Sequence, residues 1–382
     1  MPASPDVRPT RAIIDLVALC ENAALIRRAA GDTPLCAAVK ADAYGHGAVP
    51  IARALERSGL CAALAVSLVE EGALLRQAGL ALPILVMGPA LAGGHAEMAA
   101  CDLTAVVSEP DDLDELAAIG RARGRPVSIH IKIDSGMGRL GIAAAEVARV
   151  VAHALRGGGV AIDGICTHFA SADLPDLAAA TRSVDAQLAT FGGALADARA
   201  AGARPRVVHA ANSPALFRFP AARFDMVRAG IALYGNGTVR PPPELGTLRQ
   251  VMQLESEVAQ VRDVPAGQAV SYGGLWRAER PSRIAVIPIG YADGYPRRLS
   301  LTGEADALVH DMRCPVVGAI SMDMTLVDVT CLEDDARVGD AVVLLGSQGD
   351  QSISTAEFAE RAGLIEYEVT CGISRRVPRT YR

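Results

Sequence analysis

Aromatic residues are scarce in this chain of 382 residues, since 7 tyrosines, 6 phenylalanines and 1 tryptophan make up 4% of it. A strong excess of one charge is also lacking, because 37 basic residues stand against 43 acidic ones and give a formal net charge of −6. A basic surface for nucleic acid is therefore not expected. Hydrophobic residues reach 51%, which excludes a disordered chain. Because aromatic residues are few, each tyrosine is a candidate for a specific role.

Paired cysteines are lacking as well. The 8 cysteines are scattered without a C-x-x-C pair, which is typical of free thiols in a reducing compartment. A membrane span is not expected either. Residues 77–96 carry no charged side chain, but glycines and prolines interrupt them, which favours a strand and turns over a helix. We therefore expect a cytoplasmic protein that does not bind a membrane.

Motifs for metal and serine-hydrolase chemistry are missing too. The chain has no H-E-x-x-H, no His/Cys cluster with metal-ligand spacing and no G-x-S-x-G. We therefore expect no metal site.

Short apolar runs alternate with helical segments through the first 235 residues. The starts of the runs lie roughly 20 to 45 residues apart, a spacing typical of βα units. The candidate strands are residues 36–40, 62–66, 83–87, 103–107, 127–133, 161–168, 206–210 and 226–233. The pattern predicts an α/β fold in which residues 11–235 form a (β/α)8 TIM barrel.

A linker and a second domain follow. Residues 236–246 contain three consecutive prolines and further glycines, a composition typical of linkers. Beyond them, apolar runs come with turn signals and little helical periodicity. We therefore expect residues 247–382, together with residues 1–10, to form a mostly β C-terminal domain with one short helix capped by Ser354.

Functional residues of such a barrel gather where its strands end. Lys40 ends the first predicted strand, where partial desolvation would favour the neutral amine that forms Schiff bases. The alternative is a structural lysine that extends to the rim of the barrel.

The run 129–134 alternates strictly, with isoleucines on one side and His130, Lys132 and Asp134 on the other. The polar side would face the barrel interior, where a charge needs a partner or a modification. A G-x-G-x-x-G motif follows at residues 136–141. A dinucleotide site is not favoured, because the central strand of a doubly wound sheet is apolar on both faces.

Further polar groups follow the later strands. His168 lies at the end of the sixth strand, where a structural role is the alternative to a catalytic one. Ser213 is expected to cap a helix that starts at Pro214, and with Gly230 it falls where barrels often hold a phosphate. A capped helix without a ligand is the alternative. Combined with Lys40, a phosphate site indicates pyridoxal phosphate.

These motifs resemble those of the alanine racemase family, whose pyridoxal-phosphate enzymes combine an (α/β)8 barrel with a C-terminal β domain. The matching segments occur in family order from residue 38 to the C-terminus. They are residues 38–47, 132–141, 167–170, 211–213, 227–231, 270–273, 290–294, 321–323, 367–369 and 376–379.

The resemblance implies a two-base racemase. Lys40 would hold the cofactor and act as the base on one face of the substrate Cα, and Tyr272 would act on the other face. In the family this tyrosine reaches the lysine of the other subunit, so a homodimer with shared active sites is implied. A tyrosine of unperturbed pKa is a poor base at neutral pH, so His168 and Arg139 would need to favour its phenolate. Arg228 would face the pyridine nitrogen and, because a guanidinium stays protonated, would weaken the ring as an electron sink.

The remaining implied roles concern binding. Besides Lys40, Arg139 and Arg228, the cofactor-binding set would be Tyr44, His168, Asn212, Ser213, Gly230, Ile231 and Tyr367. Arg139 and the Met322 backbone N–H would contact the substrate carboxylate. Lys132 would be carbamylated and could then pair with Arg139. An unmodified Lys132 paired with Asp134 is the alternative.

The chain departs from the family at the substrate entrance, where Tyr291 is also expected. Ala319 stands where many members have arginine, and Ser321 stands where others have cysteine. The implied function is isomerisation of L-alanine and D-alanine, for D-alanine biosynthesis and peptidoglycan precursors or for alanine catabolism. A racemase of serine or larger amino acids is an alternative, although Tyr367 would crowd a larger substrate. A non-catalytic pyridoxal-phosphate carrier is a third interpretation, against which Tyr272 argues.

Overall fold

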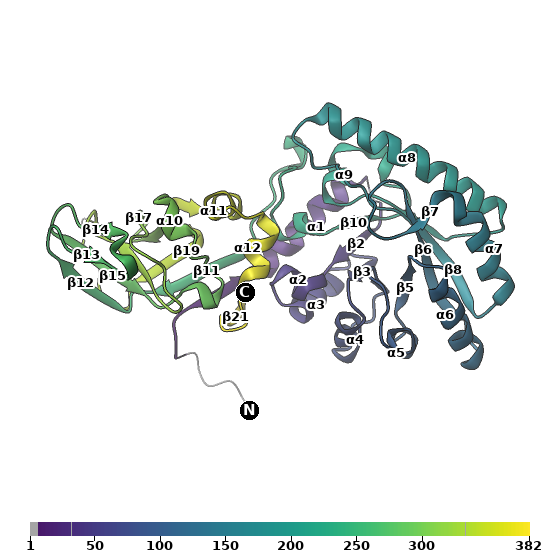
Figure 1. The fold of residues 1–382 in the computed structure, drawn as a ribbon, viewed down its shortest axis with the longest axis horizontal. Coiled ribbons are helices and arrows are strands. Elements are labelled where there is room, and N and C mark those ends of the chain that lie inside the picture. The colour runs from purple at the N-terminus through teal and green to yellow at the C-terminus, as the bar shows by residue number, and fades with distance from the viewer. Residues whose placement is uncertain (1–6, 32, 333) are drawn as a thin grey trace. The chain divides into compact units, whose positions relative to one another are not determined.

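The computed structural model describes residues 7–31, 33–332 and 334–382. The chain divides into two compact units, shown in Figure 1. Within the described residues, the barrel unit comprises Leu19–Ala43 and Gly47–Arg249, and the sheet unit comprises residues 7–18, Tyr44–His46 and Gln250–Arg382. Residues 1–6, which the sequence assigned to the C-terminal domain, lie outside the described residues.

A parallel sheet forms the centre of the barrel unit. Its strand order is β10 (Val227–Ala229), β2 (Leu35–Ala38), β3 (Ala63–Val66), β4 (Ile84–Val86), β5 (Thr104–Val107), β6 (Val127–Asp134), β8 (Val160–Cys166) and β9 (Val207–His209). A parallel bridge between His209 and Met226 nearly closes the barrel. Each of these strands lies where the sequence predicted one, so the predicted barrel is confirmed. A short strand, β7 (Ile142–Ala143), is added to β6.

Helices alternate with these strands and lie outside them (Figure 1). They are α1 (Leu16–Ala29), α3 (Ala48–Ser58), α4 (Val69–Gln77), α5 (Gly94–Ala100), α6 (Asp111–Ala122), α7 (Val147–Gly157), α8 (Leu177–Ala200) and α9 (Ser213–Arg218). In α3 the buried residues Ala48, Ile51, Ala52 and Leu55 recur at the spacing of one helical face.

Small aliphatic side chains and thiols fill part of the barrel. One buried cluster consists of Cys36, Ala63, Ala65, Leu85, Val106, Cys166 and Met226. No aromatic ring belongs to this cluster. The low aromatic content of the chain therefore matches an interior packed with short side chains.

The sheet unit contains a mostly antiparallel sheet. Its order is β17 (Met312–Pro315), β16 (Asp306–Val309), β19 (Ala341–Gln348), β11 (Met252–Glu257), β1 (Arg11–Ile14) and β21 (Arg379–Tyr381), with β20 (Gln351–Ile353) beside β19. The strands β12 (Gln260–Val264), β15 (Ser282–Ile287) and β18 (Thr325–Asp328) form a second sheet, and β13 (Ala269–Val270) pairs with β14 (Trp276–Arg277). The mostly β architecture predicted for this part of the chain is confirmed.

The sheet unit contains more helix than the sequence predicted. Ser354 accepts from the Glu357 N–H at 3.1 Å and caps α11 (Thr355–Ala362), as expected. The helices α10 (Leu299–Thr302) and α12 (Glu366–Gly372) were not expected, because segments this short show no clear helical periodicity. Within the described residues, no helix has both the length and the apolar character needed to cross a membrane.

Candidate active site

Lys40 directly follows the first barrel strand and begins a turn of unusual conformation, α2 (Lys40–Tyr44). Ala41, Asp42 and Ala43 have φ values of 51° to 54°, in the left-handed region. Such residues cost roughly 1–2 kcal/mol each and are found mainly at functional sites. Asp42 stabilises the turn, because its Oδ1 accepts from the Ala48 N–H at 2.7 Å. The Lys40 side chain is exposed in the single chain.

Strand β6 directs His130 and Lys132 into the barrel, as its alternation predicted; they are only 6% and 5% exposed. Burial lowers the pKa of Lys132, and the cations Arg139 and Arg228 lower it further. Among the described residues, none forms an ion pair or a hydrogen bond with the Lys132 ammonium, although the Lys132 backbone pairs with Cys166 on β8. Its predicted alternative partner, Asp134, forms other contacts.

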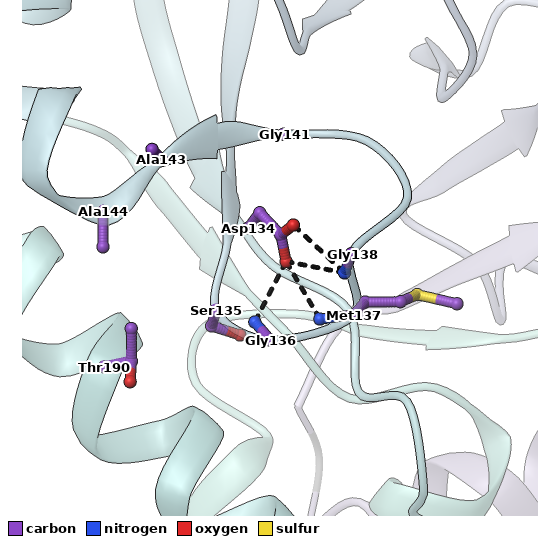
Figure 2. A pocket seen from close by; sticks show the side chains of 9 residues that line it. All are labelled: Asp134, Ser135, Gly136, Met137, Gly138, Gly141, Ala143, Ala144 and Thr190. Atoms are coloured by element: carbon purple, nitrogen blue, oxygen red, sulfur yellow. Dashed lines mark hydrogen bonds between the residues drawn. The ribbon is translucent and has the colours of Figure 1, made fainter.

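Asp134 organises the loop that follows β6 (Figure 2). Its Oδ1 accepts from the backbone N–H groups of Gly136 and Met137 at 2.9 Å and of Gly138 at 3.1 Å. Burial raises the pKa of Asp134, but these donors outweigh it and the pKa lies below its usual value. The glycine motif is thus a loop held by a carboxylate, and Arg139, which is exposed, lies in this loop directly after Gly138.

Arg228 on β10 is the centre of a buried polar cluster. Its guanidinium donates to the carbonyl oxygens of Thr167 at 2.7 Å and Ala210 at 3.0 Å. It also lies 2.6 Å from His209 Nδ1 and 3.2 Å from His168 Nδ1. Burial, followed by the charge of Arg228, lowers the pKa of both histidines well below the usual value. Both rings are therefore neutral at neutral pH, and no described carboxylate pairs with Arg228.

The loops after β9 and β10 meet at Ser213. The structure makes Asn212 the N-cap of α9, since its Oδ1 accepts from the Ala215 N–H at 3.1 Å. The prediction that Ser213 caps this helix is therefore wrong by one residue. Ser213 Oγ instead accepts from the N–H groups of Gly230 at 2.9 Å and Ala232 at 3.4 Å, at the start of η3 (Ile231–Tyr234).

In the sheet unit, Tyr44 and Tyr367 lie together with ring centroids 5.9 Å apart. Burial raises the pKa of Tyr44. Beside it, the backbone passes close to α12: a Cβ on Gly45 would lie 2.1 Å from the Thr370 carbonyl oxygen. Arg379 donates to the Gly45 carbonyl oxygen at 3.0 Å and so helps to hold this segment.

Tyr272, in η5 (Tyr272–Gly274), is 73% exposed and borders a cavity of about 290 Å³. The cavity is lined by Ser271, Tyr272, Ala319, Ser321, Met324 and Leu326. Ser271 has a φ of 65° and donates from its hydroxyl to the Ala319 carbonyl oxygen at 2.6 Å. This hydrogen bond holds the segment that carries Tyr272 against the segment that contains Ala319, a position at which the chain departs from the family.

The segments that carry Tyr291 and Met322 also lie together. The Tyr291 N–H donates to the Ser321 carbonyl oxygen at 3.0 Å, and the Ala292 N–H donates to that of Met322 at 3.1 Å. Main-chain hydrogen bonds thus join the segment of Tyr291, a residue expected at the substrate entrance, to the segment of Ser321 and Met322.

Two polar groups in these neighbourhoods were not assigned roles from the sequence. His209 joins Arg228 to His130, although its position in the seventh strand gave no sign of a partner. Asp293 is fully buried and pairs with Arg8 at 2.9 Å and with Arg376 at 3.3 Å. An isolated aspartate in a glycine-rich turn carries no signal for such partners.

Family models match nearly the whole chain. The model described as "Alanine racemase, N-terminal domain" matches residues 14–237, and "Alanine racemase, C-terminal domain" matches residues 251–381. The chain belongs to the alanine racemase family. The resemblance inferred from the motifs is therefore confirmed, and with it the assignment to an isomerase family.

Individual members of the alanine racemase family are similar over their full length. The alanine racemase of Sorangium cellulosum is 43% identical over 98% of this chain and 100% of its own, and that of Symbiobacterium thermophilum is 42% identical over 98% and 97%. Among solved structures, alanine racemase from D-cycloserine-producing Streptomyces lavendulae has a TM-score of 0.90 at 39% identity, covering 100% of this chain and 98% of its own. The Bacillus anthracis alanine racemase with bound L-Ala-P has a TM-score of 0.88 at 35% identity, with 99% and 96% covered.

Proposed function

We propose that this protein is an alanine racemase that interconverts L-alanine and D-alanine with pyridoxal 5'-phosphate. The observation that carries the proposal is the buried Arg228, held by carbonyl oxygens and neutral imidazoles in a chain of the racemase family. An arginine facing the pyridine nitrogen would weaken the ring as an electron sink, and this favours a reaction that returns a proton to Cα.

The residues of the barrel unit fit this cofactor. Arg228 offers a fixed cation that only donates hydrogen bonds and stays protonated, so it can face a pyridine nitrogen without protonating it. Ser213 Oγ accepts hydrogen bonds from the N–H groups of both Gly230 and Ala232. These residues lie in the loops where barrels commonly bind phosphate. Lys40, Arg139, His168, Asn212 and Ile231 of the barrel unit, and Tyr44 and Tyr367 of the sheet unit, complete the proposed cofactor-binding set.

When bound, pyridoxal phosphate supplies the electron sink that makes the substrate Cα–H acidic. Lys40 holds the cofactor and exchanges a proton with one face of Cα, and Tyr272 exchanges a proton with the opposite face. Arg139 and the Met322 N–H bind the substrate carboxylate. Arg228 would face the pyridine nitrogen without protonating it, which would weaken the ring as an electron sink and favour return of a proton to Cα.

We also propose a homodimer in which Tyr272 acts with Lys40 of the partner subunit. The 73% exposure of Tyr272 and the exposed position of Lys40 in one chain support this arrangement. The 8 free cysteines suit a reducing, cytoplasmic location.

Lys132 is proposed to carry a carbamate. Its lowered pKa makes the neutral amine more available for reaction with carbon dioxide. The product is an anion, which would replace an unpaired buried cation and could pair with Arg139. Intact mass under mild conditions is expected to show one added carbon dioxide in the wild type and none in Lys132→Met.

A coupled racemisation assay over a panel of L- and D-amino acids tests the function. We expect alanine to be the best substrate and Lys40→Ala and Tyr272→Phe to lose racemisation. Full activity of Lys40→Ala would refute the mechanism, and equal rates for alanine and bulky amino acids would refute the substrate. Cofactor binding without racemisation would indicate a carrier. Growth of a deletion strain with and without D-alanine separates the biosynthetic from the catabolic role.

A further inference from the structure

A chain of three polar side chains from different strands runs through the interior of the barrel unit. His130 Nδ1 lies 2.8 Å from His209 Nε2, and His209 Nδ1 lies 2.6 Å from an Nη atom of Arg228. All three side chains are buried. The two imidazole rings meet edge to face, with centroids 5.0 Å apart. A continuous hydrogen-bonded path therefore links Arg228 on β10 to His130 on β6.

The chemistry of the three groups sets the direction of these hydrogen bonds. A guanidinium can only donate, so His209 Nδ1 must accept from Arg228. A neutral imidazole has one donor and one acceptor, so His209 carries its proton on Nε2 and donates it to His130 Nδ1. Without an acceptor at His130, the Nε2 proton of His209 would be left without its partner.

The protonation of both rings agrees with this assignment. Burial lowers the pKa of His130 to about 4; Asp163 opposes this shift, while Arg228 and Arg206 add to it. Burial, Arg228 and His130 lower the pKa of His209 well below its usual value. Both imidazoles are therefore neutral at neutral pH, and Arg228 remains the cation of the chain.

A glycine and a bulge allow His130 to reach His209. The two histidines stand on β6 and β9, which are separated by β8, so their backbones are about two strand spacings, or about 9–10 Å, apart. The register between β6 and β8 shifts after Ile129, which places Gly164 opposite His130. A Cβ on Gly164 would lie 2.6 Å from the atoms of the His130 ring. The ring can therefore cross β8 only because this position has no side chain.

We propose that His130 is a positioning residue for Arg228. By accepting the Nε2 proton of His209, it holds His209 as an acceptor for the guanidinium and so keeps Arg228 in the orientation that faces the pyridine nitrogen. This inference rests on the proposed role of Arg228 in the racemase.

Three variants of the holoenzyme separate this role from simple packing. His130→Leu removes the acceptor, whereas His130→Asn can keep an amide oxygen close to the place of Nδ1. Gly164→Ala leaves the histidine in the chain but forces its ring to move. His153→Leu is the matched control, because His153 is an exposed histidine of the same unit. Melting temperatures are recorded for every variant.

The measurements are kcat and KM for racemisation and the amount of pyruvate formed per racemisation. Pyruvate reports transamination, in which alanine transfers its amino group to the cofactor, whose aldehyde becomes an amine. For His130→Leu and Gly164→Ala we expect kcat to fall about tenfold to a hundredfold, with a higher pyruvate fraction and a nearly unchanged KM. His130→Asn is expected to restore most of the kcat. Wild-type kcat and pyruvate fraction in His130→Leu, or equal losses in His130→Leu and His130→Asn, would overturn the proposal.

Nitrogen-15 NMR of histidine-labelled holoenzyme gives a readout independent of activity. The His209 resonances, assigned by their loss in His209→Gln, are expected to show the proton on Nε2 in the wild type and in His130→Asn, and an altered protonation pattern in His130→Leu. An unchanged His209 pattern in His130→Leu overturns the role of His130. A wild type that binds the cofactor but racemises no amino acid overturns the proposed function instead, while the NMR comparison still decides whether His130 governs His209.

Discussion

Replacement of Asp134 by alanine is expected to release the loop that carries Arg139. The carboxylate accepts from the backbone N–H groups of Gly136, Met137 and Gly138. Hydrogen bonds to a charged acceptor contribute about 1.5–3 kcal/mol each when shielded from water. Gly136 and Gly138 are exposed, so in the variant water can accept hydrogen bonds from their N–H groups and recover part of the lost free energy. We therefore expect Asp134→Ala to destabilise the barrel unit by about 2 kcal/mol in total, less than the sum of three shielded bonds.

The same substitution is expected to raise KM for alanine more than it lowers kcat, because a mobile loop places Arg139 less often in position to bind a carboxylate. Asp134→Asn keeps one oxygen acceptor and should lose about half as much stability. Asp114→Ala removes an exposed aspartate of the same unit and should change stability by less than about 0.5 kcal/mol. Denaturant unfolding and steady-state kinetics measure both effects. Wild-type stability and KM in Asp134→Ala would show that the three hydrogen bonds do not hold this loop.

Three further predictions concern buried charge, backbone conformation and pH. Asp293→Ala removes a buried carboxylate that accepts from Arg8 at 2.9 Å and from the Gly290 N–H at 3.1 Å, and should destabilise the sheet unit in calorimetry by about 1–3 kcal/mol; wild-type stability would contradict this. Gly45→Ala, with a φ of 83° and a Cβ 2.1 Å from a carbonyl oxygen, should lower the melting temperature far more than Gly59→Ala, where φ is also positive but nothing lies within 4 Å. The pKa of His130 falls from 6.5 to about 4 on folding, so its contribution of about 3 kcal/mol is present above pH 6.5 and is lost as pH falls toward 4. His130→Asn should flatten this part of the stability profile, and an unchanged profile would refute the assignment.

Much of the barrel could be predicted because its signals are local. The spacing of apolar runs gave the strands, and strict alternation in β6 showed that His130 and Lys132 face inward. Predictions that depend on a single residue, such as the position of an N-cap, were less reliable. Ser213 and Asn212 are both good N-cap residues, and only the extended backbone of Asn212 decides between them.

The candidate site could be predicted only in part. Family motifs indicated Lys40 and Tyr272, but a strand end does not reveal exposure, and Lys40 is exposed in the chain by itself. The buried partners of Asp293 come from residues 285 positions before it and 83 positions after it in the chain, so no local pattern could indicate them.

The sequence by itself determined the order of the strands, the inward faces, the family and the residue types available for chemistry. Periodicity reports which side of an element is buried, and this depends only on neighbouring residues. Tertiary structure alone decided which buried groups meet. His130 and His209 are 79 residues apart and touch because a register shift sets Gly164 beneath an imidazole ring. The scarcity of aromatic residues is visible in the composition alone. Only the tertiary structure explains it, because a cluster in the barrel is packed with short aliphatic side chains and thiols instead of aromatic rings.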